Sequence, residues 1–281
     1  AIDVETANSK FSSICQVGMV AFEDGKEVSS LSFLVDPAVP FSPMNTRIHG
    51  ITARDVVGSR RFRDAYGIIR EWTHQAHVVS HSHFDRSAIR LACESCSLQP
   101  PEWQWLDSAR IARQTWPELE KEGYRLSRVA AHLGIRFRHH DALEDARACG
   151  LIVSYALERS GRPLTDFSAA RLGGEAVKFG RDKLVRTGDG DGALTGETIV
   201  FTGELSMGKG RAADMAALAG GNVGESVTKK TTMLVVGERD IQPGWAATSL
   251  KHQKAEALIA KGQDIRIVGE EDFLALAAIT E

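Results

Sequence analysis

A run of alternating glycine and aspartate at residues 188–192 is the feature that most constrains how this 281-residue chain can fold. Glycine loses more conformational freedom on folding than any other residue, and neither glycine nor aspartate favours the interior of a helix or strand. The chain is also long enough to form two modest domains. The run therefore predicts a break in the chain, with a globular segment on each side of it.

The segment that leads into this break is basic. Residues 159–186 contain seven Lys and Arg against three Asp and Glu, whereas the whole chain has a net charge of only −3. We interpret residues 159–193 as a basic, Gly-rich linker between domains at residues 1–158 and 194–281. A basic linker could follow a phosphate backbone, but a solvated connector is the simpler interpretation, which we favour.

Residues 1–158 have strands first and helices later. Apolar runs bounded by turn signals predict strands near residue 2 and at 14–22, 28–35 and 78–79. Helical periodicity predicts helices at 65–72, 85–91, 108–114, 126–133 and 142–157. This order indicates an α/β fold in which helices cover the sheet.

Residues 194–281 alternate strands with helices. We expect strands at 198–202, 233–236 and 265–268. We expect helices at 211–219, 249–261 and 270–278. Short alternating elements of this kind predict a small parallel sheet.

The composition excludes a membrane-spanning protein. No apolar stretch approaches the ~20 residues that a spanning helix needs, and the N-terminus has no charged leader followed by an apolar run. We therefore expect a cytoplasmic protein with no membrane partner. Four cysteines are too scattered for a disulfide framework or a zinc site, and we interpret them as reduced thiols: Cys15, Cys93, Cys96 and Cys149.

Asp3 and Glu5 form a carboxylate pair on the first predicted strand, where a period of two places both on one face. Their neighbours Ile2 and Val4 are apolar, so we expect a central strand whose carboxylates face a cleft. Two anions there are costly unless a cation neutralises them; the alternative is a solvated strand face. Because Asp3 lies so close to Ala1, we expect the natural chain to begin a few residues earlier.

Further acidic residues lie at two predicted helix starts. Asp85 follows the strand at 78–79, and taken alone it could be a simple N-cap. Asp141 and Glu144 have the spacing of a capping box, so the next helix should begin at Asp141. This places His140, just before the cap, against Asp145 in the first turn. The alternative is a structural histidine beside a surface aspartate.

Together these segments resemble the ordered motifs of the DnaQ-like exonucleases of the DEDDh branch, which includes the epsilon subunit of bacterial DNA polymerase III. The motifs are Ile-Asp-Val-Glu-Thr at 2–6, His-Gly-Ile-Thr at 49–52, Phe-Asp-Arg-Ser at 84–87 and His-Asp-Ala-Leu-Glu-Asp-Ala at 140–146. The resemblance covers residues 1–158. It implies an RNase H-like fold, a mixed sheet flanked by helices, and hydrolysis from nucleic-acid 3′ ends, expected to be DNA in repair or proofreading.

The resemblance also implies roles for particular residues. Four carboxylates would bind two divalent metal ions, Mg²⁺ or Mn²⁺: Asp3, Glu5, Asp85 and Asp145. These hard ions prefer oxygen ligands, and a pair of them can stabilise both the attacking and the leaving oxygen of a phosphodiester. His140 would accept the proton of the attacking water, since an unperturbed histidine has a pKa near ~6.5. Thr6 and His49 would line the pocket of the terminal nucleotide.

Two positions depart from the pattern of this family. Ser82 stands where an asparagine is usual, and Ala7-Asn8 stands where Thr-Gly often follows the first motif. Both departures concern substrate contacts, so they bear on the preferred substrate and leave the reaction class intact. The alternatives are an RNase that trims short RNA 3′ ends and a catalytically silent scaffold.

Residues 194–281 resemble a single BRCT domain, as found in bacterial NAD-dependent DNA ligase. The resemblance rests on Val-Phe-Thr-Gly at 200–203, Gly-Gly at 220–221 and Leu-Val-Val-Gly at 234–237, and Trp245 departs from the usual signature. It implies recruitment to a protein or to DNA with a 5′-phosphate.

A phosphate site is expected in this BRCT-like domain at Thr202, Gly203 and Lys251. A hydroxyl and a backbone amide at a strand end can cradle a phosphate, and the first turn of a helix favours an anion. The alternative is that Thr202 caps a turn and Lys251 is a solvated charge.

Overall fold

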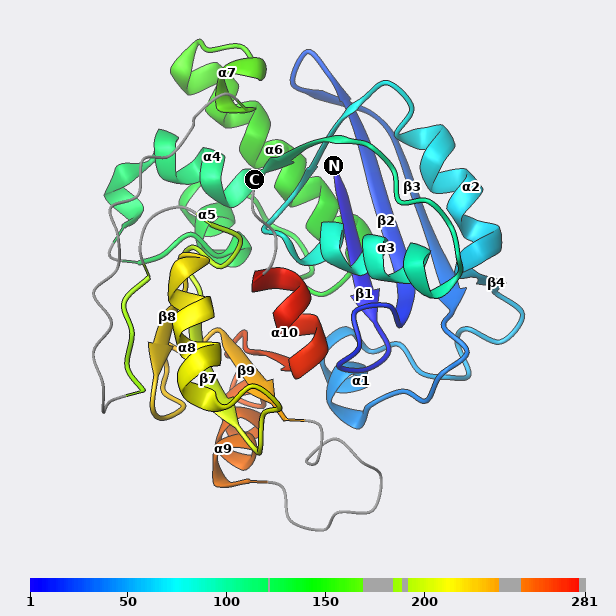
Figure 1. The fold of residues 1–281 in the computed structure, drawn as a ribbon. Coiled ribbons are helices and arrows are strands. Elements are labelled where there is room, and N and C mark those ends of the chain that lie inside the picture. The colour runs from blue at the N-terminus through cyan, green and yellow to red at the C-terminus, as the bar shows by residue number, and fades with distance from the viewer. Residues whose placement is uncertain (121, 169–183, 189–191, 238–248, 278–281) are drawn as a thin grey trace. The chain divides into compact units, whose positions relative to one another are not determined.

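A computed structural model of the chain describes residues 1–120, 122–168, 184–188, 192–237 and 249–277 (Figure 1). The chain divides into two compact units, Ala1–Ala170 and Arg171–Glu281. Both described ends of the segment predicted as a linker are packed: Phe167 is buried in the first unit, and Arg186 bridges to Val223 in the second. Residues 169–183 and 189–191 of that segment lie outside the described part.

The first unit opens with an antiparallel meander of β1, β2 and β3, which the short β4 joins in parallel. On the other side, β5 lies against β1 and pairs in parallel with β6. The predicted mixed sheet is therefore confirmed. Its strands are β1 (Ile2–Thr6), β2 (Ile14–Glu23), β3 (Lys26–Asp36), β4 (Arg60–Arg61), β5 (His77–Ser80) and β6 (Gln104–Asp107).

Helices of the first unit cover this sheet (Figure 1). They are α1 (Pro43–His49), α2 (Phe62–Trp72), α3 (Phe84–Ser95), α4 (Ser108–Thr115), α5 (Leu126–His132), α6 (Ala142–Ser160) and α7 (Thr165–Ser168), with a 3₁₀ turn at Pro117–Leu119. The sequence predicted α2 to α6 and missed α1, whose seven residues include Pro43 and show little periodicity.

The longest of these helices, α6, lies against β1 and β2. Two glycines permit its close approach: a Cβ atom at Gly18 would overlap the backbone carbonyl of Ala142, and one at Gly150 would overlap the ring of Phe22. A hydrophobic cluster between α4, α5 and α6 holds the other side of the helix, with Trp116 and Ile152 among its buried members. Burial of each such large side chain contributes about 1.5–3 kcal/mol.

The second unit contains a four-stranded parallel sheet in the order β10-β9-β7-β8. The prediction of a small parallel sheet is therefore confirmed. Its strands are β7 (Thr198–Thr202), β8 (Asn222–Gly224), β9 (Met233–Val236) and β10 (Arg266–Gly269). Its helices are α8 (Lys209–Leu218), α9 (Leu250–Ile259) and α10 (Glu270–Ala277). The BRCT resemblance stays a prediction, and Trp245 lies outside the described residues.

Two expectations from composition can be compared with the structure. All four cysteines are free thiols in the structure, and three of them are buried. Among the helices in the described ranges, none is long and apolar enough to cross a membrane.

Candidate active site

The carboxylates of β1 lie beneath the start of α6. In the register of the sheet, Asp3 lies opposite Gly18 and Glu5 lies opposite Gln16. Both β2 residues contact the start of α6. Gly18 leaves room for the backbone of Ala142, and the Gln16 side chain accepts a hydrogen bond from the Ala142 amide at 3.2 Å. Residues opposite one another in a sheet share a face, so the first turn of α6 lies over the two carboxylates.

The cap of α6 brings a third carboxylate to this point. The Asp141 side chain accepts hydrogen bonds from two backbone amides of the first turn, at 3.1 and 3.4 Å, so the predicted helix start is confirmed. Asp145, which is 3% exposed, then faces the sheet. One oxygen each from Asp3, Glu5 and Asp145 lies within 4.8 Å of the others.

Asp85 reaches the same strand from α3. The ring of Phe84 packs edge-on against Phe11, with centroids 4.7 Å apart, which fixes the start of α3 against the loop after β1. The buried Asp85 side chain then accepts the backbone amide of Val4 at 2.9 Å. The simple N-cap alternative is wrong, because His83 occupies the cap position. Asp85 also lies close enough to Asp3 for its charge to raise the pKa of Asp3.

The electrostatics of this cluster favour a cation. Burial raises the pKa of Asp3 well above its ordinary value, and repulsion from Asp85, Asp145 and Glu5 raises it further. A bound cation removes both penalties. Every donor is a hard oxygen, as Mg²⁺ and Mn²⁺ prefer, so these residues fit divalent ions. Such ions would neutralise the charge on a phosphodiester and stabilise its attacking and leaving oxygens.

The residue before the cap turns the chain sharply. His140 has φ +65°, and its backbone amide donates to Asp145 at 2.7 Å. Its ring Nδ1 lies 3.9 Å from Glu5 Oε1, and 29% of the side chain is exposed, so the ring can reach a water at the cluster. The predicted proximity of His140 and Asp145 is confirmed through the backbone.

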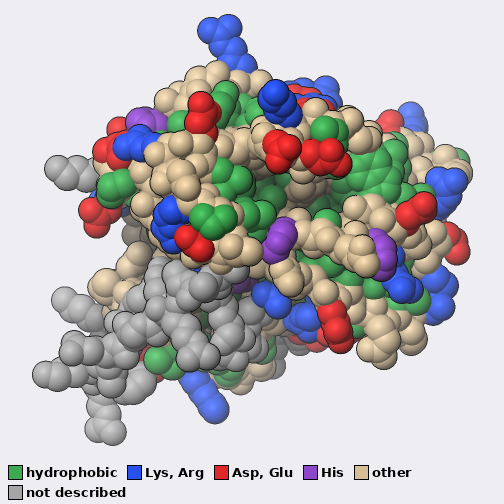
Figure 2. All heavy atoms as spheres, turned by 90° about the horizontal axis from the view of Figure 1, so that it is seen from above, with side chains coloured by type: hydrophobic (Ala, Val, Ile, Leu, Met, Phe, Trp, Pro, Cys, Tyr) green, Lys and Arg blue, Asp and Glu red, His purple; other side chains and the backbone are tan. Residues whose placement is uncertain are grey.

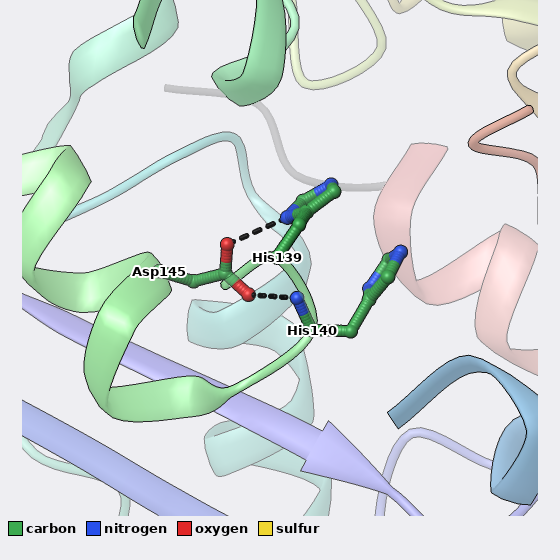
Figure 3. Close-up of side chains that lie close together, drawn as sticks. All are labelled: His139, His140 and Asp145. Carbon is green, nitrogen blue, oxygen red and sulfur yellow. Dashed lines mark hydrogen bonds and ion pairs between the residues drawn. The ribbon is translucent and has the colours of Figure 1, made fainter. Parts of the chain in front are cut away.

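The His139 ring also contacts Asp145, which the sequence did not predict, while a ring nitrogen of His140 lies within 4.8 Å of an Asp145 oxygen as expected. His139 Nδ1 lies 2.6 Å from Asp145 Oδ1, and the His139 ring stacks on that of His140 with centroids 4.0 Å apart (Figure 3). Consecutive side chains normally diverge, but the left-handed turn at His140 places both rings on one side. The sequence feature that could have indicated this contact is the pair of histidines directly before the helix cap.

The two residues predicted to line a nucleotide pocket meet at the end of β1. His49 Nδ1 accepts the Ile51 amide at 3.0 Å, so Nε2 carries the hydrogen that is donated to the Thr6 carbonyl at 3.1 Å. Asn45, one turn earlier on α1, donates to the same carbonyl at 2.9 Å. Burial lowers the pKa of His49 to about 4, and the nearby His140 also lowers it, so the ring is neutral near pH 7. Asn45 lies in no motif or periodic segment, so the sequence alone did not predict it.

The loop that carries Asp85 is held by Asp107, which the sequence analysis also missed. Asp107 ends β6 opposite Ser80, and its carboxylate accepts the amides of Ser82 at 3.0 Å and Ala109 at 2.8 Å. Ser82 has φ +85°, a region that favours glycine and asparagine. The asparagine usual at this position would therefore suit the backbone better than serine.

The residues predicted to bind phosphate lie together in the second unit: Thr202, Gly203 and Lys251. Lys251 Nζ donates to the Phe201 carbonyl at 3.0 Å, which places the amine beside the end of β7. The Thr202 hydroxyl is buried and lies 2.5 Å from that of Ser249. Burial lowers the pKa of Lys251, and the neighbouring Lys209 adds to the effect.

Charges of both signs are mixed on one face of the molecule. On the face drawn in Figure 2, Lys and Arg side chains are dispersed among Asp and Glu side chains. This agrees with the net charge of −3. The net charge alone therefore gives no general attraction to a polyanion.

Comparison with known proteins assigns the first unit. The family described as Exonuclease, of the RNase T type, matches residues 1–153. The chain belongs to this family. Its residues 1–153 are a 3′→5′ exonuclease domain, a hydrolase of the DEDDh type, and enzymes of this kind normally use two divalent metal ions.

Curated relatives agree with this assignment. The chain is 31% identical over 163 residues to a PolC-type DNA polymerase III of Clostridium perfringens, an alignment that covers 56% of this chain and 11% of that protein. It is 27% identical over 198 residues to exodeoxyribonuclease 10 of Escherichia coli K12, covering 63% of this chain and 82% of that one. A solved 3′-exonuclease bound to a histone mRNA stem-loop shares the fold at 15% identity, with a TM-score of 0.50, covering 56% of this chain and 80% of that one.

A relative of another kind is a DNA ligase of Gemmatimonas aurantiaca. It is 39% identical over 88 residues, which are 31% of this chain and 12% of the ligase. This chain therefore spans only about a tenth of the length of both the PolC-type polymerase and the ligase.

Proposed function

We propose that the chain is a metal-dependent exonuclease that removes nucleotides from DNA 3′ ends in repair or proofreading. The convergence of Asp3, Glu5 and Asp145 within 4.8 Å, under strong mutual repulsion, is the observation that carries this proposal. The preference for DNA is supported by the similarity to exodeoxyribonuclease 10 and to polymerases.

In this proposal the chain's own residues divide the work. Asp3, Glu5, Asp85 and Asp145 hold two Mg²⁺ or Mn²⁺ ions. His140 accepts the proton of the attacking water on its partly exposed ring, a role typically worth ~10²–10⁴ in rate. Thr6, clamped by α1 through its carbonyl, borders the terminal nucleotide. The neutral His49 then acts by fixing Thr6, since both of its ring nitrogens already make hydrogen bonds.

The test is degradation of matched single-stranded DNA and RNA, each labelled at its 5′ end, with Mg²⁺, Mn²⁺ or EDTA. We expect DNA to shorten progressively from its 3′ end with either metal and to persist in EDTA. Asp145→Asn is the inactive control. Shortening of RNA alone would favour the RNase alternative, and intact polymers under all conditions would favour a silent scaffold.

For the second unit we propose a BRCT-like domain that binds a terminal phosphate on DNA or a phosphorylated protein. Two observations support this. The ligase alignment is as long as the predicted segment 194–281, and the end of β7 lies near the starts of α8 and α9, which carry Lys209 and Lys251. A partly buried lysine beside a second lysine favours an anion.

This part of the proposal predicts a preference that full-length protein should show. In EDTA, the chain should bind a DNA duplex with a 5′-phosphate more tightly than the same duplex with a 5′-hydroxyl, as measured by fluorescence anisotropy. Lys251→Met should remove the preference, whereas Lys261→Met, an exposed lysine after α9, should retain it. Equal binding of both duplexes by the unaltered chain would favour a module that docks proteins.

A further inference from the structure

A nitrogen-rich corner adjoins the carboxylate cluster. His139, His140 and Asp145 each present a ligand atom within 4.8 Å of the other two (Figure 3). In Figure 3 both imidazole rings lie on the same side of the turn, and Asp145 extends toward them from the first turn of α6. Each histidine side chain is 29% exposed and Asp145 is 4% exposed, so an ion could enter past the rings.

This donor set differs in chemistry from that of Asp3 and Glu5. Imidazole nitrogens suit borderline transition metals, and Zn²⁺ commonly binds His and Asp in a tetrahedral arrangement. Mg²⁺ prefers oxygen ligands at an octahedral site. The two donor sets, His139, His140 and Asp145 on one side and Asp3, Glu5 and Asp145 on the other, therefore favour different ions even though they share Asp145.

The distances are compatible with zinc. Bonds of ~2.0–2.2 Å to a tetrahedral ion place two ligand atoms about 3.4 Å apart. His139 Nδ1 lies 2.6 Å from Asp145 Oδ1, and a ring nitrogen of His140 lies within 4.8 Å of a ligand atom of each. The His139 and Asp145 atoms would have to separate by about 0.8 Å to hold an ion between them.

We propose that His139, His140 and Asp145 form a regulatory site for a borderline divalent ion such as Zn²⁺, which turns the exonuclease off. Asp145 bound to this ion is withdrawn from the hard-ion cluster, and the His140 ring can no longer accept a proton from water. Roughly micromolar Zn²⁺ should therefore inhibit in the presence of roughly millimolar Mg²⁺. The inhibitory part rests on the proposed function, whereas the binding part does not.

Binding is tested directly on the full chain. Zn²⁺ affinity is measured by competition with a chromophoric chelator, and Co²⁺ serves as a probe because its visible spectrum reports nitrogen ligands. His139→Phe removes one donor and retains a ring to stack on His140 and to face Phe137. His139→Gln is a second variant with the same loss of donor, and His74→Ala is an exposed control.

We expect both His139 variants to bind Zn²⁺ at least tenfold more weakly and to lose part of the Co²⁺ spectrum. Glu5→Gln, which weakens the oxygen corner, should change Zn²⁺ affinity by less than about threefold. The reverse order, with Glu5→Gln most damaging and His139 variants unaffected, would overturn the proposal and place Zn²⁺ among the carboxylates.

Activity separates this inference from the proposed function. A Mg²⁺-dependent nuclease whose zinc affinity does not depend on His139 would contradict the inference alone. A chain that binds Zn²⁺ through His139 but degrades no polymer with Mg²⁺ would retain the metal site and contradict the proposed exonuclease. Inhibition by Zn²⁺ that is relieved in His139→Gln would support both.

Discussion

The carboxylate cluster of the first unit and the lysine site of the second unit differ in how well their polar groups are satisfied. The carboxylates repel one another, whereas the groups of the lysine site make hydrogen bonds. At the cluster, burial and three neighbouring carboxylates raise the pKa of Asp3, so ionisation of that side chain is opposed by the fold. At the lysine site, the Thr202 and Ser249 hydroxyls bond to one another and the Lys251 amine bonds to a backbone carbonyl.

This difference indicates how strongly each region calls for a ligand. Carboxylates held together against repulsion have a cost that near neutral pH is removed by a bound cation or by protonation, and such costs cluster at functional sites. Groups that satisfy one another gain less when an anion arrives, because existing hydrogen bonds are exchanged for new ones. The cluster should therefore depend absolutely on its ligand, whereas the lysine site should bind modestly.

The largest expected effect is the loss of hydrolysis when a carboxylate of the cluster is neutralised. Asp3→Asn or Asp145→Asn should lower the rate on single-stranded DNA by on the order of 10³-fold or more, because a two-ion site cannot assemble without its ligands. Asp36→Asn makes the same change in an exposed ion pair on β3 and should retain activity. A neutralised cluster with near-normal activity at saturating Mg²⁺ would remove the contrast between the regions.

The next effect separates proton transfer from metal binding within the first region. His140→Ala should lower the chemical rate by about 10²–10⁴-fold, because a general base is lost, and should leave Mn²⁺ affinity nearly unchanged. Single-turnover kinetics and calorimetric titration measure the two quantities, and His74→Ala is the control. If Mn²⁺ affinity falls together with the rate, His140 is a ligand of the working ions.

The strongly patterned elements of both regions were predictable from the sequence. The cap at Asp141 located the start of α6 and therefore Asp145, and the period of two placed Asp3 and Glu5 on one face. These inferences succeed because capping and strand alternation are local properties of the chain.

The contacts that assemble the site could not be read in the same way. Gln16 and Gly18 matter because the register of β1 with β2 places them beside the carboxylates under α6. Asp107 matters because β6 ends next to the loop of Ser82. The ring of His139 reaches Asp145 only because the chain turns at the next residue. Each depends on tertiary register or on a backbone angle, which local pattern does not specify.

A smaller effect concerns the free energy of unfolding without metal. Removal of a polar group should raise it at the carboxylate cluster and lower it at the lysine site. In EDTA, Asp3→Asn should stabilise the chain by on the order of 1–2 kcal/mol near pH 7. Because the folded-state pKa of Asp3 is raised, the normal chain keeps its stability at low pH and loses it as pH rises through that pKa. The advantage of the variant should grow with pH and disappear in acid. Thermal unfolding from pH 4 to pH 8 would show a constant difference if repulsion were not the cause.

The smallest effect has the opposite sign and falls in the second unit. Thr202→Val should destabilise that unit by about 1 kcal/mol, because the buried hydroxyl that pairs with Ser249 is replaced by a methyl group. Hydrogen exchange of the amides in β7 and β9 measures this locally, and Thr198→Val on the same strand controls for the change of residue type. If Thr202→Val instead slows hydrogen exchange in these strands, the Thr202 hydroxyl destabilises the folded unit. The lysine site would then resemble the carboxylate cluster, as a site built around a ligand.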